Sequence, residues 1–205
     1  MQTTHGGPAT SPTGTSLPGK TALRSYYRAQ RKAHVASLGP AREAAERALV
    51  PQLLLLPTLP GPIASYASIG DEIDPQWVEA ALGPHAFPRI NGKQLSFHLA
   101  AWKDLVPGPL GIPQPRADAP EITPRLLLVP LLAATRTGLR LGQGGGYYDR
   151  TLAHLRSTVN VAGPVTAIGL AWDMQIADHL PAEPHDQLLD WIATPTQLVD
   201  CRQTR

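Results

Sequence analysis

The residues with the clearest chemical meaning form one segment, Arg140-Leu141-Gly142-Gln143-Gly144-Gly145-Gly146-Tyr147-Tyr148-Asp149-Arg150. Four glycines in five positions stand between an apolar run and an amphipathic stretch. Glycine lets a ligand approach the backbone closely, and the start of the next helix offers free N–H groups with partial positive charge. The segment predicts an anion cradle, usually for phosphate, with a flexible turn as the alternative. It lacks the Gly-Lys-Ser/Thr of a Walker A loop and does not follow the first strand, as a Rossmann fingerprint would.

Basic residues recur at helical spacing near the N-terminus. At about 100° per residue, Lys20, Arg24, Arg28 and Arg31 fall on one face of a helix, and apolar side chains fall on the other. Lys20 and Arg24 are one turn apart, so both can point at the same polyphosphate. The alternative is a solvated face, and we expect Arg28 and Arg31 to belong to one.

Two further groups have both a local and a chemical interpretation. Asp149 falls in the first turn of the helix after the glycines, where it either complements the helix dipole or reaches Mg²⁺ beside bound phosphate. His185 has no metal-like spacing to another histidine or to a cysteine. We therefore expect it to be a hydrogen-bonding loop residue and not a zinc ligand.

Composition narrows the classes of protein. The 205 residues are 42% hydrophobic and 17% charged, which favours one folded domain. The 22 prolines and 18 glycines argue against long helices and a helical bundle. The 18 basic and 16 acidic residues are too balanced for general nucleic-acid binding. A single cysteine, Cys201, excludes an internal disulfide framework. With no secretory signal and no long apolar run, we expect a cytoplasmic protein without a membrane span.

The pattern along the chain predicts an α/β fold. Residues 1–19 are expected to be a disordered leader and residues 20–205 a single domain. We expect helices over residues 20–38, 40–55, 75–82 and 147–157, and a short terminal helix capped by Thr194-Pro195. Strands are expected over residues 63–67, 86–90, 94–99, 126–130, 165–172 and 188–193, with extended loop over 107–124. Alternating strands and helices favour a largely parallel central sheet.

The glycine segment resembles the signature of the 5-formyltetrahydrofolate cyclo-ligase family, also called methenyltetrahydrofolate synthetase. Further matching motifs, in the same order as in the family, extend the resemblance over residues 20–198. They are Lys20-Thr21-Ala22-Leu23-Arg24, Tyr66-Ala67 with Asp71-Glu72-Ile73-Asp74, Val129-Pro130-Leu131-Leu132-Ala133, and Ile168-Gly169-Leu170-Ala171-Trp172 with Gln175, Leu180-Pro181, His185-Asp186 and Asp190. The chain departs from the family pattern at Ala134-Thr135, Gln114-Pro115 and Gln143.

The resemblance implies a three-layer α/β/α fold of the sugar-phosphate isomerase and coenzyme A transferase kind. It also implies that ATP and Mg²⁺ drive ring closure of 5-formyltetrahydrofolate to 5,10-methenyltetrahydrofolate, giving ADP and phosphate. Arg140, Lys20 and Tyr148 are the implied catalytic residues, and Asp149 and Asp186 the implied metal ligands. The implied ATP-binding residues are Lys20, Thr21, Ala22, Leu23, Arg24, Arg140, Leu141, Gly142, Gln143, Gly144, Gly145, Gly146, Tyr147 and Tyr148. The implied folate-binding residues are Ala67, Glu72, Gly144, Gly145, Gly146 and Tyr147.

Rival interpretations stay open at this point. Glu72 beside Asp71 is also compatible with an ordinary acidic loop. The departures leave room for a family-like protein that binds nucleotide or RNA without cyclising folate. A sugar-phosphate enzyme that uses the same loop is a third possibility. For the main interpretation we expect small-molecule substrates, no nucleic acid, no membrane, and a monomer or weak homodimer.

Overall fold

The computed structural model describes residues 18–83, 85–158 and 164–203. The leader expected over residues 1–19 therefore falls almost wholly outside the described residues. None of the described helices is long and apolar enough to cross a membrane.

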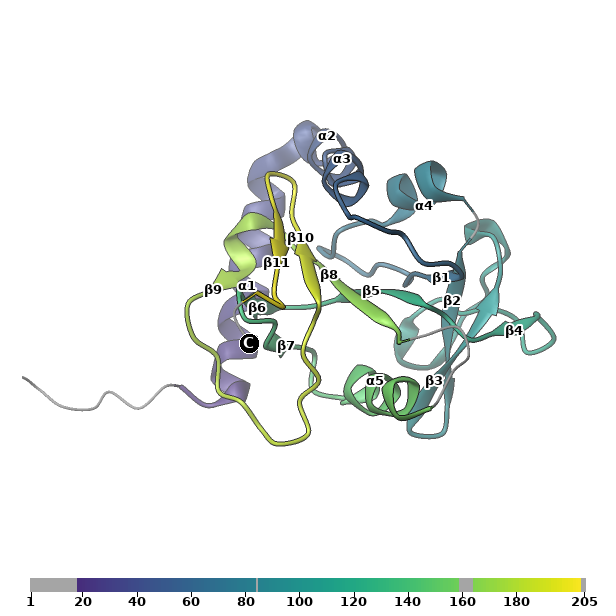
Figure 1. The fold of residues 1–205 in the computed structure, drawn as a ribbon. Coiled ribbons are helices and arrows are strands. Elements are labelled where there is room, and N and C mark those ends of the chain that lie inside the picture. The colour runs from purple at the N-terminus through teal and green to yellow at the C-terminus, as the bar shows by residue number, and fades with distance from the viewer. Residues whose placement is uncertain (1–17, 84, 159–163, 204–205) are drawn as a thin grey trace, which may run out of the picture.

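An eight-stranded sheet in the order β11-β10-β8-β5-β1-β2-β3-β4 runs through the molecule (Figure 1). Its five middle strands, from β10 to β2, are parallel to one another, and β11, β3 and β4 pair antiparallel at the two edges. The mostly parallel sheet confirms the predicted fold class. The strands are β1 (Ile63–Ala64), β2 (Ala86–Asn91), β3 (Gln94–Leu99), β4 (Glu121–Ile122), β5 (Leu126–Pro130), β8 (Thr166–Leu170), β10 (Trp191–Ala193) and β11 (Leu198–Asp200).

Strand β5 shows how the sheet is buried on both faces. Leu126 and Leu128 belong to one apolar cluster, and Leu127 and Val129 belong to the other. Successive side chains of a strand point to opposite faces, so a continuous apolar run is what a doubly covered parallel strand requires. Pro130 ends the strand, as expected, since it has no N–H to donate.

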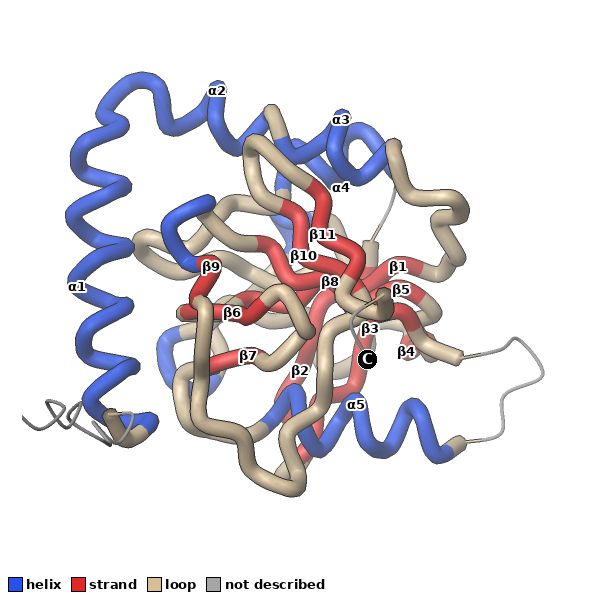
Figure 2. The backbone as a smooth tube through the Cα atoms, turned by 60° about the vertical axis from the view of Figure 1, so that its left-hand side comes forward, coloured by secondary structure: helices blue, strands red, loops and turns tan. Residues whose placement is uncertain are grey.

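Helices cover both faces of this sheet (Figure 1). Helices α1 (Lys20–Leu38), α3 (Leu49–Leu54) and α4 (Gln76–Leu82) contribute to the cluster that contains Leu126 and Leu128. Helix α5 (Tyr147–Ser157) packs Leu152 against the opposite cluster. Figure 2 shows α1 running along the side of the molecule, beside a smaller sheet of β7 (Arg140–Leu141), β6 (Ala133–Thr135) and β9 (Ile176–Ala177).

Two expected helices are wrong in extent or kind. The helix expected over residues 40–55 is a 3-10 turn (Gly39–Ala41), α2 (Arg42–Arg47) and α3, with the break at Ala48. Pro51 lies in the first turn of α3, where a helix does not need the N–H that proline lacks. In the interior of one long helix that N–H would be needed, so α2 does not continue through Pro51. The segment after Thr194 is a hairpin to β11 and not a helix, because the Thr194 N–H donates to Gln197 O at 2.9 Å.

Two predicted loop and strand extents also change. The strand expected over residues 63–67 is regular only at Ile63–Ala64, although Ser65 N–H still donates to Ala86 O. The segment 107–124 is mostly irregular, as its prolines require, but contains the short 3-10 turn Pro109–Gly111 and edge strand β4. This segment forms one wall of the pocket described next.

Candidate active site

A pocket of about 390 Å³ lies beyond the carboxyl ends of β1 and β5, where ligands bind in open parallel sheets. It gathers most of the residues that the sequence predicts for a site. Of the predicted set, those lining it are Lys20, Arg24, Ala67, Glu72, Arg140, Leu141, Gly142, Gln143, Gly144, Gly145, Gly146, Tyr147, Tyr148, Asp149 and Asp186. Thr21, Ala22 and Leu23 do not line it, since Thr21 and Ala22 are exposed and Leu23 packs on the apolar cluster around Leu141.

The glycine segment forms one side of the pocket, between β7 and the start of α5. Gly144 has φ 107° and Gly146 has φ 65°, backbone conformations that glycine adopts without steric cost. A Cβ at Gly146 would also lie 2.6 Å from the Arg150 guanidinium. Within the described residues, no side chain caps the first turn of α5, so its N–H groups are available to an anion in the pocket.

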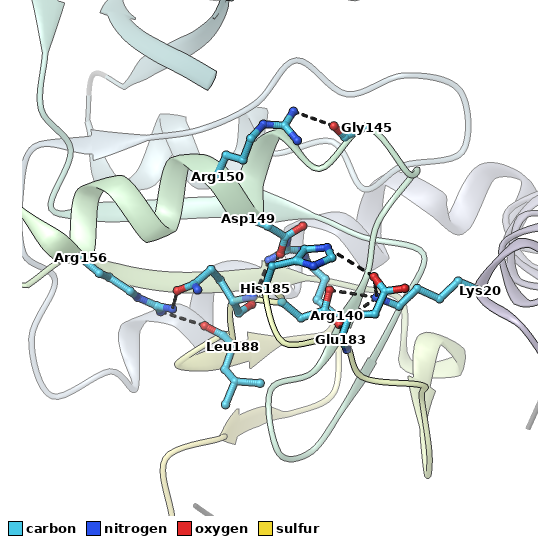
Figure 3. A network of polar contacts seen from close by, with 11 residues as sticks. Lys20, Arg140, Gly145, Asp149, Arg150, Arg156, Glu183, His185 and Leu188 are labelled. Carbon is cyan, nitrogen blue, oxygen red and sulfur yellow. Dashed lines mark hydrogen bonds and ion pairs between the residues drawn. The ribbon is translucent and has the colours of Figure 1, made fainter. Parts of the chain in front are cut away.

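Lys20 lies at the mouth of the pocket among carboxylates (Figure 3). Its Nζ is 2.8 Å from Asp186 Oδ2 and 2.9 Å from Glu183 Oε2. Burial opposes the charged lysine, but the hydrogen bonds to the two carboxylates outweigh it and raise the pKa of Lys20. The same bond lowers the pKa of Asp186 against the effect of its own burial. Both groups are charged at neutral pH.

Arg140 and Asp149 form a second ion pair beside the glycine segment. Arg140 Nη2 donates to Asp149 Oδ1 at 2.7 Å, and the Gln187 N–H donates to the same oxygen at 3.1 Å. Arg140 Nη1 also donates to the Gln187 carbonyl. Asp149 thus faces both a cation and the helix N-terminus. Arg24 Nε donates to the Gly142 carbonyl at 3.0 Å, which fixes the start of the glycine segment against α1.

Glu72 lines the same pocket, beside Gln143 of the glycine segment. Its Oε2 accepts from the Ile69 N–H at 3.2 Å, and the Gln143 amide donates to the same carboxylate. Burial raises the pKa of Glu72, and the nearby Arg31 charge opposes that rise. Burial also raises the pKa of Tyr148, whose hydroxyl therefore keeps its proton at neutral pH. Glu72 is a buried pocket carboxylate and not part of an ordinary acidic loop.

The expectation for Arg31 is wrong. Its side chain is 8% exposed, and Nη1 lies 3.7 Å from Glu72 Oε1. Arg28 is exposed as expected, but its Nε donates to the Gln143 side chain at 2.9 Å. His185 is an exposed loop residue, as expected, with Nε2 3.3 Å from Glu183 Oε2. Of the basic stripe, Lys20 and Arg24 line the pocket, and Arg28 and Arg31 contact residues that line it.

A model of the 5-formyltetrahydrofolate cyclo-ligase family matches residues 18–195. The chain belongs to this family. The 5-formyltetrahydrofolate cyclo-ligase of Mycolicibacterium smegmatis is 44% identical over 70 residues, 34% of this chain and 33% of that protein. That of Escherichia coli K12 is 33% identical over 118 residues, 56% of this chain and 61% of that protein. The matches thus cover less than two thirds of these relatives' own lengths.

Solved structures of the family share the fold. The NMR structure of Aquifex aeolicus 5,10-methenyltetrahydrofolate synthetase gives a TM-score of 0.74 at 23% identity, covering 91% of this chain and 94% of that one. The Mycoplasma pneumoniae 5,10-methenyltetrahydrofolate synthetase gives 0.63 at 21% identity, covering 86% and 98%. The likeness extends over nearly the whole chain and confirms the predicted architecture.

Sequence reasoning missed two groups of pocket residues. Glu183 shares Lys20 with Asp186, and its position three residues before Asp186 was the available signal. The apolar walls gave no chemical signal, because proline, leucine and isoleucine are ordinary core residues. They come from the β2–β3 hairpin and the proline-rich segment and consist of Pro88, Ile90, Leu95, Pro109, Leu110 and Ile112.

Proposed function

We propose that this protein closes the ring of 5-formyltetrahydrofolate to 5,10-methenyltetrahydrofolate at the expense of ATP and with Mg²⁺. One observation carries the proposal: a single pocket brings together a glycine cradle with cations and a buried carboxylate with apolar walls. We call the part around the cradle and Lys20 the nucleotide end and the part around Glu72 the folate end. Such a pocket suits a polyphosphate and a flat heterocycle held side by side. Family membership and the fold shared with methenyltetrahydrofolate synthetases support it.

The cradle end suits the phosphates of ATP. The free N–H groups at the start of α5 and the close backbone approach at Gly144 and Gly146 provide a site for an anion. Lys20, Arg24 and Arg140 line the same end and supply positive charge. Catalysis of phosphoryl transfer is mainly positioning and charge neutralisation, which is what this end offers.

The carboxylates at this end fit Mg²⁺, which prefers oxygen ligands and usually takes one or two carboxylates beside substrate phosphate. Ligand atoms of Glu183, His185 and Asp186 lie within 4.8 Å of one another, and Asp149, which is not in that group, lines the same pocket. Asp149 and Asp186 would hold the ion, and Glu183 would be available as a further ligand. When bound, Mg²⁺ neutralises charge on the transferring phosphoryl group. Lys20 and Arg140, which neutralise these carboxylates in the structure, would then turn to the phosphates.

The Glu72 end suits the pterin. An ionised carboxylate can accept paired N–H bonds from the amino-pyrimidinone edge of the ring. Tyr147 and Tyr148 line the adjacent wall, and the protonated Tyr148 hydroxyl can donate to the substrate. The hairpin and the proline-rich segment supply apolar surface for the rest of the folate. This arrangement would place the formyl group between Glu72 and the cradle.

The formyl oxygen must be converted into a good leaving group before the ring can close. The formyl oxygen attacks the γ-phosphorus, and the bond between that phosphorus and ADP breaks. The second folate nitrogen then attacks the activated formyl carbon and loses its proton to water. The carbon–oxygen bond breaks, phosphate leaves, and the new ring shares its positive charge between two nitrogens. Lys20 and Arg140 stabilise the charge on the phosphoryl oxygens.

Turnover of the purified protein tests the proposal. The full chain is incubated with 5-formyltetrahydrofolate, ATP and Mg²⁺, and the methenyl product is followed by its absorbance. We expect product only when all three are present, with one ADP formed for each methenyl group. A folded protein that binds both ligands but forms no product would contradict the proposal and favour the nucleotide-binding alternative.

A further inference from the structure

Arg31 is a buried arginine that is not among the residues lining the pocket. It lies on α1, and the Arg31 and Glu72 side chains are 8% and 7% exposed. Burying two charges is costly unless each compensates the other. The 3.7 Å separation of Nη1 from Oε1 allows that compensation without a direct hydrogen bond.

The hydrogen bonds of Arg31 are too few to explain its burial as a structural tie. Nη1 donates to the Leu131 carbonyl at 3.3 Å, and Nε is buried with no hydrogen-bond partner among the described residues. The Leu131 carbonyl is also bonded by Gln175 Nε2 at 2.9 Å, so it does not depend on Arg31. The principal interaction left to Arg31 is electrostatic and is directed at Glu72.

The backbone around Glu72 is fixed by other side chains. Trp172 Nε1 donates to the Asp71 carbonyl at 3.1 Å, Arg42 Nη2 to the Glu72 carbonyl at 2.9 Å, and the Tyr66 hydroxyl to the Ile73 carbonyl at 2.8 Å. Three consecutive carbonyls are thus held from three separate segments. Removing the Arg31 charge would leave this loop in place and change only its carboxylate.

The groups that face Glu72 decide whether it is ionised. Tyr66 and Tyr148 approach it as neutral hydroxyls whose own pKa values are raised by burial, and Arg42 reaches only its backbone. Arg31 is the cation that opposes the effect of burial on the carboxylate. A protonated Glu72 would present a donor where the pterin edge needs an acceptor.

We propose that Arg31 is a positioning residue for folate recognition, which holds Glu72 ionised and turned so that it accepts the N–H groups of the pterin edge. This inference rests on the proposed function of the pocket. It makes Arg31 act through Glu72 and without touching the substrate. Substituting Arg31 should therefore have no further effect on folate binding once Glu72 has been replaced.

A double-mutant cycle tests this dependence. Arg31→Met, Glu72→Gln and the double variant are compared in their KM values for the formyl-folate substrate and for ATP, each with Mg²⁺. We expect Arg31→Met to raise the folate KM roughly tenfold and the ATP KM by less than about twofold. In the Glu72→Gln background the same change should have almost no further effect. A further tenfold rise there, or an equal rise in both KM values, overturns the proposal.

The pH profile separates positioning from a loss of packing. In Arg31→Met the acid limb of kcat/KM for folate should move to higher pH, because only the hydrogen bonds from Ile69 and Gln143 then oppose the effect of burial, which favours protonated Glu72. Arg31→Lys, which keeps the charge, should restore most of the limb. Arg31→Gln, which also removes the charge, replaces Arg31→Met in the cycle if that variant fails to fold. An acid limb that stays at the wild-type pH in Arg31→Met, or in its absence an additive effect of Arg31→Gln with Glu72→Gln, contradicts the proposal.

Arg202→Met is the control for the loss of an arginine ion pair. Arg202 pairs with Asp200 at 2.9 Å and lies outside the residues that line the pocket. The change should leave both KM values unchanged. If wild-type protein turns over while the cycle is additive, only the role of Arg31 fails. If wild-type protein does not turn over, the proposed function fails first.

Discussion

The two ends of the pocket hold their charges in different ways. At the nucleotide end, two carboxylates share one lysine: Lys20 contacts Asp186 and Glu183 directly, and the side chains of Lys20, Asp186 and Glu183 are 15%, 9% and 49% exposed. At the folate end, Glu72 is buried and stands 3.7 Å from Arg31. The half-exposed Glu183 can release Lys20 at little cost, whereas a pair that is buried on both sides cannot lose one member cheaply. The nucleotide end is therefore suited to exchange a lysine–carboxylate contact for one with phosphate, and the folate end to keep a fixed charge for recognition.

The largest effect should come from Lys20→Ala. The change removes a cation from the phosphate site and leaves Asp186 and Glu183 to repel the nucleotide. We expect kcat/KM for ATP to fall about 100-fold or more, with the folate KM changed only a few-fold. Steady-state kinetics with each substrate varied in turn measures both. Lys32→Ala, an exposed lysine of the same helix, is the control, and similar losses in the two variants would show that the site is misassigned.

Asp149→Asn should have the next largest effect. The amide cannot bring negative charge to Mg²⁺, and it weakens the 2.7 Å pair with Arg140. We expect turnover to fall by about 10- to 100-fold and the activity titration to need more Mg²⁺. Asp118→Asn, which changes an exposed aspartate paired only with Arg116 among the described residues, is the control. Wild-type rates and an unchanged Mg²⁺ titration in Asp149→Asn would remove Asp149 from the metal site.

Acidification should disable the folate end before the nucleotide end. Burial raises the pKa of Glu72 above 4.5, while the Lys20 bond, against burial, lowers the pKa of Asp186 below 3.8. A carboxylate loses its charge as pH falls through its pKa, so Glu72 becomes neutral first. The folate KM should rise as pH falls through the raised pKa of Glu72, and Glu72→Gln should abolish this limb. A limb that persists in Glu72→Gln would assign it to another group.

Salt should produce the smallest difference between the two ends. The contact between Lys20 and the half-exposed Glu183 at the nucleotide end is screened by added ions, whereas the buried Glu72 is screened much less. Raising potassium chloride tenfold should raise the ATP KM several-fold and the monoglutamate folate KM by about half as much or less. Equal slopes for the two substrates would remove this distinction between the ends.

Sequence reasoning succeeded where it depended on local patterns. Two of the glycines before α5, Gly144 and Gly146, have positive φ values, which glycine adopts without steric cost. The apolar run ended by Pro130 is a buried central strand. Most residues carried over from the family resemblance line one pocket. These features are local, or are motifs that the fold brings together.

Two errors concern contacts that the helical pattern does not define. Helical periodicity places Arg31 on the basic stripe, but only the packing of the segment after β1 shows that Glu72 covers it. Thr194-Pro195 is typical of a helix start, yet Thr194 donates its backbone N–H to Gln197 and its hydroxyl to Asp173, which closes a hairpin instead. Neither Glu72 nor Asp173 is close in sequence to the residue that it contacts.

The most direct test of the account is a crossed measurement on wild type, Lys20→Ala and Glu72→Gln. Methenyl product is followed by absorbance with ATP varied at saturating 5-formyltetrahydrofolate and then with the roles exchanged. We predict wild-type turnover, a loss confined mainly to ATP in Lys20→Ala, and a loss confined mainly to folate in Glu72→Gln. Parallel losses for both substrates in both variants, or no turnover by well-folded wild type, would contradict a pocket with a nucleotide end and a folate end.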